Sequence, residues 1–189
     1  MAVGIPSIDK LQLDVAFGKR FEKAWTVRAD SRLLVIDDDA DQISKFSDSE
    51  DDEPRALVVL NEKNKLIVLL AIDHKLLDNH PGGIADCAVF DDEQLEFVEF
   101  KTNAYGNSEE SIRDTFEKAC VQLKETLTVF NDSLSSIGID LFEAIVVECR
   151  IVVAQRFPRA TAAKQDFQAM FAEETKGITL YFERLVRFE

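Results

Sequence analysis

Apolar residues recur along the chain at spacings that predict an alternation of helices and strands. A helical period of apolar positions predicts three helices, at residues 8–25, 107–131 and 160–175. Short runs of aliphatic and β-branched residues, bounded by turn-forming residues, predict strands at 32–36, 56–61, 65–72, 144–154 and 178–188. Because only a short polar turn separates the second of these runs from the third, we expect the two to pair as a hairpin.

Residues 82–101 predict a further pair of strands that meet at a tight polar turn. The first strand precedes the turn Asp-Asp-Glu-Gln, and the second strand follows it. With the tip of the turn at its centre, Asp86 lies directly opposite Glu99, so the two side chains share one face of the hairpin. Lys101 is two residues beyond Glu99 and therefore lies on the same face.

Two carboxylates and an ammonium group on one apolar face indicate a chemical site. Carboxylates this close repel each other unless a cation lies between them, and a hard divalent ion prefers their oxygen atoms as ligands. A neighbouring lysine can hold a water molecule or stabilise developing negative charge. The residues alone leave a second interpretation open, in which Lys101 forms an ordinary cross-strand ion pair with Glu99 or Asp86 on an unrelated α/β fold.

Asp86, a gap of twelve residues and then Glu99-Phe100-Lys101 resemble the D…(D/E)-x-K signature of the PD-(D/E)XK nuclease superfamily. The run Gly83-Ile84-Ala85-Asp86 is similar to the G-x-x-D form of its first half in RecB-like nucleases. The resemblance implies an α/β fold with a restriction-endonuclease-like core, an α-β-β-β-α-β mixed sheet flanked by helices. The extra N-terminal strands and a C-terminal helix–strand pair lie outside that core, within one domain that spans residues 1–189.

The resemblance also implies an activity, which is Mg²⁺- or Mn²⁺-dependent hydrolysis of phosphodiester bonds in DNA or RNA, and DNA is the favoured expectation of the two. It implies that Asp86, Glu99 and the backbone carbonyl of Phe100 hold the metal ion. Some members of the superfamily add an acidic residue from the first helix, and Glu22 is the candidate for that position.

The same resemblance implies a role for Lys101, which would position the water that attacks the phosphate. RecB-like nucleases carry a Q-x-x-x-Y pattern on the helix that follows the hairpin. Here Gln122 matches the glutamine, and Thr126 stands in place of the tyrosine. Gln122 is therefore a candidate supporting residue, with a polar position at the edge of the core as the alternative.

The charge of the chain weighs against nucleic-acid binding, because the net charge is −14 and phosphate contacts need local positive charge. Basic residues gather around the first helix and in the last third. Arg150, Arg156 and Arg159 are the candidates for contacts with backbone phosphates. The alternative function is a catalytically silent nuclease-like module that docks a basic protein partner.

Acidic residues concentrate at about 37–53, which we expect to form a mobile acidic loop. Asp37, Asp39 and Asp41 have the spacing that begins a calcium-binding loop. Gln42, however, stands where such a loop requires glycine. The segment is therefore predicted to be a solvated loop that shields the site or faces a basic partner.

The remaining features bear on the location of the protein. The chain has three cysteines, at predicted buried positions in strands or in the long helix, which favours reduced thiols and a cytoplasmic protein. No apolar run reaches membrane-spanning length, so no membrane partner is expected. His74 and His80 lie in a polar connection and are expected to be ordinary loop residues rather than metal ligands.

Overall fold

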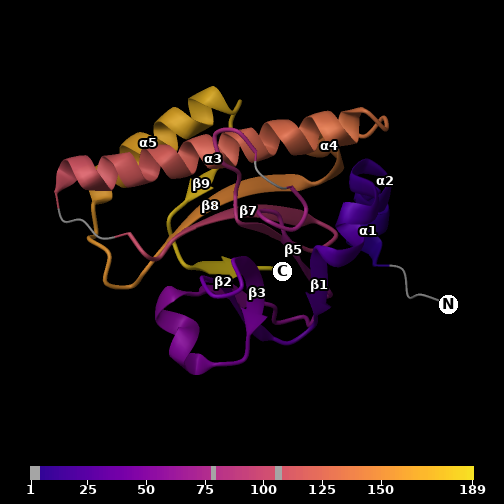
Figure 1. Cartoon of the computed structure of the whole chain (residues 1–189), viewed down its shortest axis with the longest axis horizontal. Helices are drawn as coiled ribbons and strands as arrows, with labels where there is room; N and C mark the ends of the chain where they lie inside the picture. The colour runs from indigo at the N-terminus through magenta and orange to yellow at the C-terminus, as the bar shows by residue number, and fades with distance from the viewer. Residues whose placement is uncertain (1–4, 78–79, 105–107) are drawn as a thin grey trace.

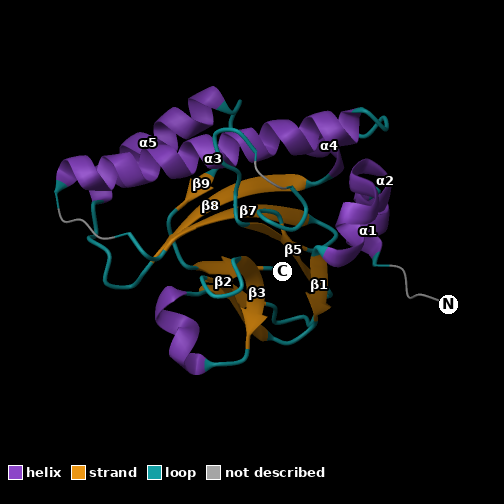
Figure 2. Cartoon of the chain, viewed as in Figure 1, coloured by secondary structure: helices purple, strands orange, loops and turns teal. Residues whose placement is uncertain are grey.

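The computed structural model describes residues 5–77, 80–104 and 108–189, and contains two β-sheets with helices beside them (Figures 1 and 2). The helices are α1 (Pro6–Leu11), α2 (Leu13–Phe17), α3 (Glu109–Ser135), α4 (Leu141–Ala144) and α5 (Thr161–Glu174), with 3₁₀ helices η1 (Gly18–Lys23) and η2 (Glu50–Arg55). The six-stranded sheet has the order β1 (Trp25–Arg28), β5 (Ile67–Ala71), β6 (Cys87–Phe90), β7 (Gln94–Lys101), β8 (Val146–Val153) and β9 (Leu180–Tyr181). The four-stranded sheet has the order β10 (Leu185–Arg187), β4 (Leu57–Leu60), β2 (Arg32–Asp38) and β3 (Ile43–Ser47).

The centre of the larger sheet is the antiparallel meander β5–β6–β7, which α3 connects to β8. Strand β8 pairs parallel with β7, as expected when a helix forms the crossover. Within the β6–β7 hairpin, Phe90 pairs with Leu95 and Cys87 pairs with Val98. This register is the one predicted from the sequence, and it brings Asp86, just before β6, to the same end of the sheet as Glu99.

The larger sheet lies between two layers, with α3 and α5 on one face and the four-stranded sheet on the other (Figure 1). Alternation along β7 produces this arrangement, because Leu95 and Phe97 pack in the cluster beneath the helices. Val98 and Phe100 pack in the cluster between the two sheets. A strand that is buried on both faces is expected to have few polar residues, so each polar residue of β7 needs a physical explanation.

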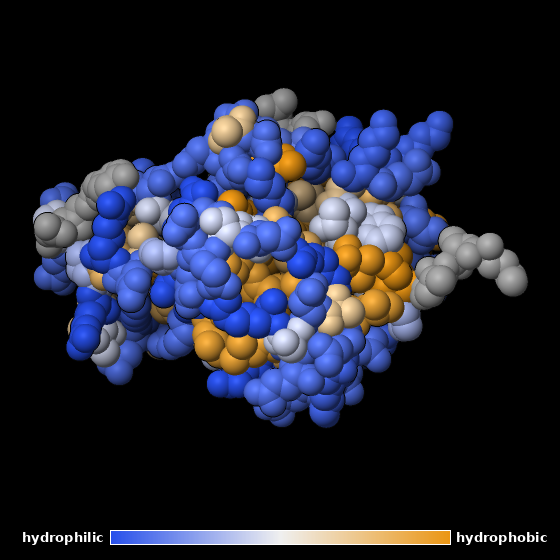
Figure 3. Space-filling model, turned by 90° about the horizontal axis from the view of Figure 1, so that it is seen from below, coloured by the Kyte–Doolittle hydropathy of each residue, from blue (hydrophilic) through white to orange (hydrophobic). Residues whose placement is uncertain are grey.

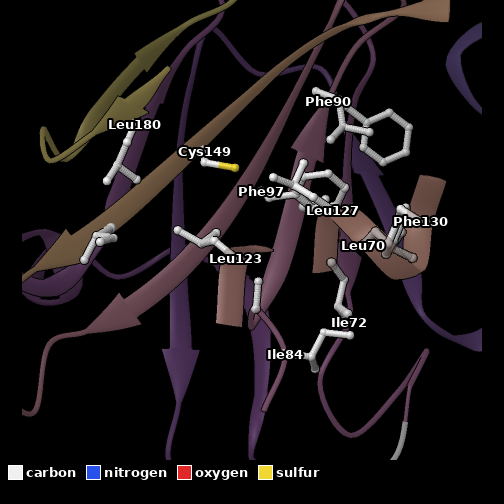
Figure 4. Packing of buried hydrophobic residues seen from close by; sticks show 14 of the residues in the cluster. Leu70, Ile72, Ile84, Phe90, Phe97, Leu123, Leu127, Phe130, Cys149 and Leu180 are labelled. Atoms are coloured by element: carbon white, nitrogen blue, oxygen red, sulfur yellow. The ribbon is translucent and has the colours of Figure 1, made fainter. Parts of the chain in front are cut away.

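The long helix α3 supplies much of the core over the larger sheet. Its apolar stripe includes Leu123, Leu127 and Phe130, which meet Phe97 and other strand residues in Figure 4. The rings of Phe97 and Phe130 lie 4.8 Å apart, with an edge-to-face tilt. The Ser108 hydroxyl caps the helix by accepting the Ser111 amide, whereas the cap expected at Asn107 lies outside the described residues.

Two predicted elements are divided between the sheets. The runs at 56–61 and 65–72 do not form a hairpin, because β4 joins the smaller sheet and β5 joins the larger one. Asn61 lies where the two runs separate. Its Nδ2 donates to the carbonyl groups of Asp30 and Lys65, and its Oδ1 accepts the Lys65 amide. The run at 178–188 likewise divides into β9 of the larger sheet and β10 of the smaller one.

Two other predicted segments have different local structure. The helix expected at 8–25 is broken into α1, α2 and η1, because Gln12 and Gly18 adopt positive φ angles of 46° and 59°. The acidic segment at 37–53, expected to be a mobile loop, contains the end of β2, all of β3 and part of η2. Ion pairs such as those of Arg32 with Glu50 and Glu53 oppose the repulsion between its carboxylates.

The face formed by the smaller sheet is largely hydrophilic, with apolar residues visible across its middle (Figure 3). Among the described residues, no helix has the length and apolar character needed to cross a membrane. Cys87, Cys120 and Cys149 lie buried as free thiols in β6, α3 and β8, which are the kinds of element predicted for them.

Candidate active site

The candidate site lies at the end of the larger sheet where Asp86 enters β6 and where β7 ends. Oδ2 of Asp86 accepts the backbone N–H of Phe100 at 2.6 Å. The backbone carbonyl of Asp86 accepts the amide of Ile72 at 2.9 Å, which ties the residue to the end of β5. Asp86 is therefore held between β5 and β7 by its own backbone and side chain.

Glu99 is the one carboxylate of this site that is almost completely inaccessible to solvent, with 1% of its surface exposed. Its Oε1 atom accepts a hydrogen bond from Nζ of Lys101 at 2.5 Å. Its Oε2 atom is buried and has no hydrogen-bond partner. A buried carboxylate oxygen without a hydrogen-bond partner lowers the stability of the fold. Oε2 of Glu99 is therefore an atom to which a bound ligand would supply the missing partner.

The site strongly disfavours negative charge on its two carboxylates. Burial raises the pKa of Glu99 to about 7, although the Lys101 ammonium group opposes that rise. Burial, followed by the negative charges of Glu99 and Asp37, raises the pKa of Asp86 well above its usual range. A cation placed between these groups would relieve the repulsion and return both carboxyls to their ionised form.

Lys101 is oriented by two acceptors on different elements. Nζ donates to Glu99 on its own strand and to Oε1 of Gln122 on α3, the second bond being 2.8 Å long. Nε2 of Gln122 donates in turn to the carbonyl of Ile84 at 3.2 Å. Gln122 therefore links the lysine to the segment that carries Asp86.

The segment that leads into Asp86 is fixed against α3 at two further points. The hydroxyl of Thr126 accepts the amide of Ala85 at 2.8 Å and donates to the Gln122 carbonyl at 2.8 Å. Gly83 packs so closely on the helix that a Cβ atom there would lie 3.0 Å from Cγ of Gln122. Thr126, the residue that departs from the RecB-like pattern, thus has its own structural role.

Carboxylates from outside the hairpin also reach this site, and sequence reasoning did not assign them to it. A pocket of about 160 Å³ is lined by Asp37, Asp39, Gln42, Ile43, Ser44, Asp73, His74 and Asp86. Asp37 comes from β2 of the smaller sheet, and Asp73 comes from the turn after β5. Burial and then the charges of Asp39 and Asp73 raise the pKa of Asp37. The signal in the sequence was the run of aspartates after a buried strand, which the spacing of a calcium loop only partly matched.

Two larger pockets meet at Lys101 on the side of α3. One has a volume of about 450 Å³ and includes Gly83, Lys118 and Gln122 in its lining. The other, of about 430 Å³, includes Asp37, Lys101 and Lys118. Lys101 therefore lies in the lining of both pockets, and Asp37 lines one of them as well as the acidic pocket.

The structure shows where two other predicted metal-site residues, Glu22 and Phe100, lie, and where the two histidines lie. Glu22 is exposed in η1, and it is not one of the residues that line the acidic pocket. Phe100 lies in β7 with its N–H bonded to Asp86, while its carbonyl as a metal ligand stays a prediction. His74 lines the acidic pocket, but its nearest ionic partner is Asp73 at 3.4 Å; His80 has a buried Nδ1 atom without a partner.

The prediction that Arg150 contacts phosphate is wrong for the folded protein. Arg150 is only 4% exposed, and its guanidinium group makes two bonds of 3.0 Å to Glu96. It also donates to the carbonyl of Glu183 at 2.8 Å and lies over the Tyr181 ring. Arg150 is buried because it lies on the face of β8 that packs against the smaller sheet and not on a solvent-exposed face.

Arg156 and Arg159 are both exposed in the connection between β8 and α5. This connection follows Val153, which pairs with Lys101 in the parallel ladder. The two arginines therefore lie beyond the same end of the sheet as the candidate site. Their predicted contact with phosphate stays a prediction.

The residues of the site fit a hard divalent cation in their chemistry. Asp86 and Glu99 offer carboxylate oxygens, and Oε2 of Glu99 is buried without a partner. In the arrangement seen here, the described part of the chain has no group of three or more His, Cys, Asp or Glu residues that could hold a metal ion. An ion bound between Asp86 and Glu99 would therefore need backbone oxygens or water to complete its shell.

A comparison of the chain with family models, with curated protein sequences and with solved structures found no match.

Proposed function

We propose that the protein is a divalent-metal-dependent nuclease that hydrolyses phosphodiester bonds in DNA or RNA. The observation that carries the proposal is the arrangement of Asp86, Glu99 and Lys101 at one end of the β6–β7 hairpin, with Oε2 of Glu99 buried and unpaired. The order β5–β6–β7–α3–β8 supports the same proposal, because β-β-β-α-β is the order of elements that the resemblance implies after the first helix.

Charge supplies the physical argument for a metal. The site places the carboxylates of Asp37, Asp73, Asp86 and Glu99 near one another, and these would repel a phosphodiester. Asp86 and Glu99 would hold Mg²⁺ or Mn²⁺, as the resemblance implies. A divalent ion bound there supplies Lewis-acid stabilisation of the negative charge that develops on the phosphate.

The residues of the chain have distinct roles in this proposal. Lys101 orients the attacking water, since its ammonium group is held in one place by Glu99 and Gln122. Gln122 is a positioning residue, because it contacts Lys101 and the Ile84 carbonyl rather than the reacting atoms. Water attacks phosphorus and loses a proton to the solvent, the P–O ester bond breaks, and the leaving oxygen takes up a proton from the solvent, so that one water is consumed.

The test is cleavage of four substrates, single- and double-stranded DNA and RNA, with Mg²⁺ or Mn²⁺. Wild-type protein is expected to cleave at least one of them, and Glu99→Ala is expected to lower the rate by about a hundredfold or more. Glu93→Gln is the matched control, because Glu93 is an exposed carboxylate at the opposite end of the same hairpin. It should leave the rate unchanged.

The control also decides the contrary outcomes. Cleavage that persists in Glu99→Ala, with Glu93→Gln behaving in the same way, would show that the activity arises elsewhere. No cleavage of any substrate by the wild type would withdraw the proposal in favour of the silent binding module.

A further inference from the structure

We propose that the pocket lined by Asp37, Asp73 and Asp86 binds a divalent cation, and that the smaller sheet thereby contributes a ligand, Asp37, to the candidate active site. The inference rests on the proposed function because Asp86 belongs to both descriptions. It goes beyond that function because neither Asp37 nor Asp73 is part of the D…(D/E)-x-K pattern.

Asp37 lies between the acidic pocket and the pocket beside Lys101. It lines the acidic pocket together with Asp86, and it also lines the pocket that includes Lys101. Its charge acts on both Asp86 and Glu99, whose pKa values it raises. A residue in this position can share an ion with Asp86 on one side and face the substrate space near Lys101 on the other.

The turn that follows Asp37 and strand β2 is anchored to the end of β7. Nδ2 of Asn103, just beyond Lys101, donates to both carboxylate oxygens of Asp39, at 2.8 and 3.0 Å. Lys45 bonds Asp38 and Asp41 across the same hairpin, at 2.5 and 2.8 Å. These partners engage the neighbouring aspartates and leave Asp37 directed to the pocket that it lines.

A buried oxygen atom beside the acidic pocket points to a missing ligand. Oε2 of Glu99 is buried and has no hydrogen-bond partner, and the residue is only 1% exposed. Asp37 and Asp73 lie near enough to Glu99 for their charges to raise its pKa. Native proteins rarely leave such an atom unsatisfied, and an ion with its water molecules between these carboxylates would supply the missing partner.

The chemistry of the pocket selects the class of ion. Its lining offers carboxylate, hydroxyl and amide oxygens, which are the ligands of hard cations such as Mg²⁺, Mn²⁺ and Ca²⁺. A volume of about 160 Å³ holds one ion with several waters, since a water molecule occupies about 30 Å³. As they stand, the carboxylates of the described residues form no group of three that could hold a metal ion, so binding requires their side chains to rotate toward it.

The test is titration of the protein with Mn²⁺ alone, by calorimetry and by the electron paramagnetic resonance of free Mn²⁺. Asp37→Asn is expected to weaken binding by at least about tenfold, since even indirect partners of a metal ligand cost that much. Asp41→Asn is the matched control, because Asp41 lies in the turn that follows β2, pairs with Lys45 and does not line the pocket. It should bind Mn²⁺ as tightly as the wild type.

Thermal unfolding separates a lost ligand from a folding defect. Without metal, Asp37→Asn should melt at or above the wild-type temperature, because the substitution removes a buried repulsive charge. With Mn²⁺, its rise in melting temperature should be smaller than that of wild type and of Asp41→Asn. If Asp37→Asn does not fold, Asp73→Asn is measured in the same way.

The outcomes distinguish the inference from the proposed function. Loss of Mn²⁺ binding in Asp37→Asn but not in Asp41→Asn supports the inference, even if wild-type protein cleaves no substrate. Equal Mn²⁺ binding by wild type, Asp37→Asn and Asp41→Asn overturns it, even if cleavage depends on Glu99. Wild-type protein that binds no Mn²⁺ at millimolar concentration overturns it as well.

Discussion

At Gly83 the backbone has a φ angle of +83°, and a Cβ atom would lie 3.0 Å from Cγ and 3.2 Å from Nε2 of Gln122. Gly83→Ala therefore combines backbone strain with a steric clash, and is expected to lower the free energy of unfolding by about 2–4 kcal/mol. Gly82→Ala is the control, because Gly82 has a φ angle of +94° with no atom within 4 Å of its Cβ position. Gly82→Ala should lower the free energy of unfolding only by the backbone strain, about 1–2 kcal/mol. Urea denaturation measures both values. Equal costs for the two substitutions would show that Gln122 moves aside freely.

Single residues also show which features of the site can be predicted from the sequence and which cannot. The hairpin register that brings Asp86 to Glu99 was predictable, because a two-residue period and a polar turn define it locally. The position of Asp37 in the acidic pocket was not, because Asp37, Asp38 and Asp39 are chemically alike and adjacent. Asp37 and Asp39 line the pocket whereas Asp38 does not, and only the packing of the smaller sheet against the larger one decides this.

Among the elements, α3 holds the segment before β6 through the hydroxyl of Thr126, which accepts the Ala85 amide at 2.8 Å. Thr126→Val removes that acceptor and leaves a buried N–H without a partner, at a cost of about 1–3 kcal/mol. Exchange of the Ala85 amide with solvent deuterium should then be at least about tenfold faster. Thr126→Ser keeps the hydroxyl and should keep the amide protected. Fast exchange in both variants would mean that packing of the methyl group, rather than the hydrogen bond, holds the segment.

The elements that were predicted correctly and incorrectly differ in what specifies them. The long helix α3 and strand β8 were predicted close to their observed bounds, because each carries a long apolar period of its own. The run at 178–188 alternates like one strand, yet it divides between β9 and β10. Alternation reports only that one face of a segment is buried, and it does not report which sheet covers that face.

Across the whole molecule, the larger sheet separates two sets of buried charges. The candidate site occupies one end of β7, with the carboxylates of Asp86 and Glu99 beside Lys101. Three residues earlier on the same strand, Glu96 is completely buried on the opposite face and bonds Arg150. Sequence reasoning took Arg150 for a phosphate contact because basic residues gather in that part of the chain. Its ion pair instead closes the interior between the sheets, and the basic character of the surface is correspondingly lower.

This buried pair makes the stability of the fold depend on pH. Burial raises the pKa of Glu96 from 4.5 to about 7, although Arg150 opposes the rise and Glu148 adds to it. Between those two pH values the unfolded chain has lost the proton while the folded protein retains it, so stability falls as pH increases. The contribution lost from pH 5 to pH 7 is about 2 kcal/mol.

The measurement is urea denaturation at pH 5, 6, 7 and 8, with wild-type protein and Glu96→Gln. Glu99 also has a raised pKa, so the pH dependence of the wild type alone does not isolate one residue. The difference between wild type and Glu96→Gln cancels the Glu99 contribution and should shrink by about 2 kcal/mol between pH 5 and pH 7. A difference that stays constant over this range would mean that Arg150 keeps Glu96 ionised throughout. In that case the interior between the sheets contains a full ion pair, which stabilises the fold equally at both pH values.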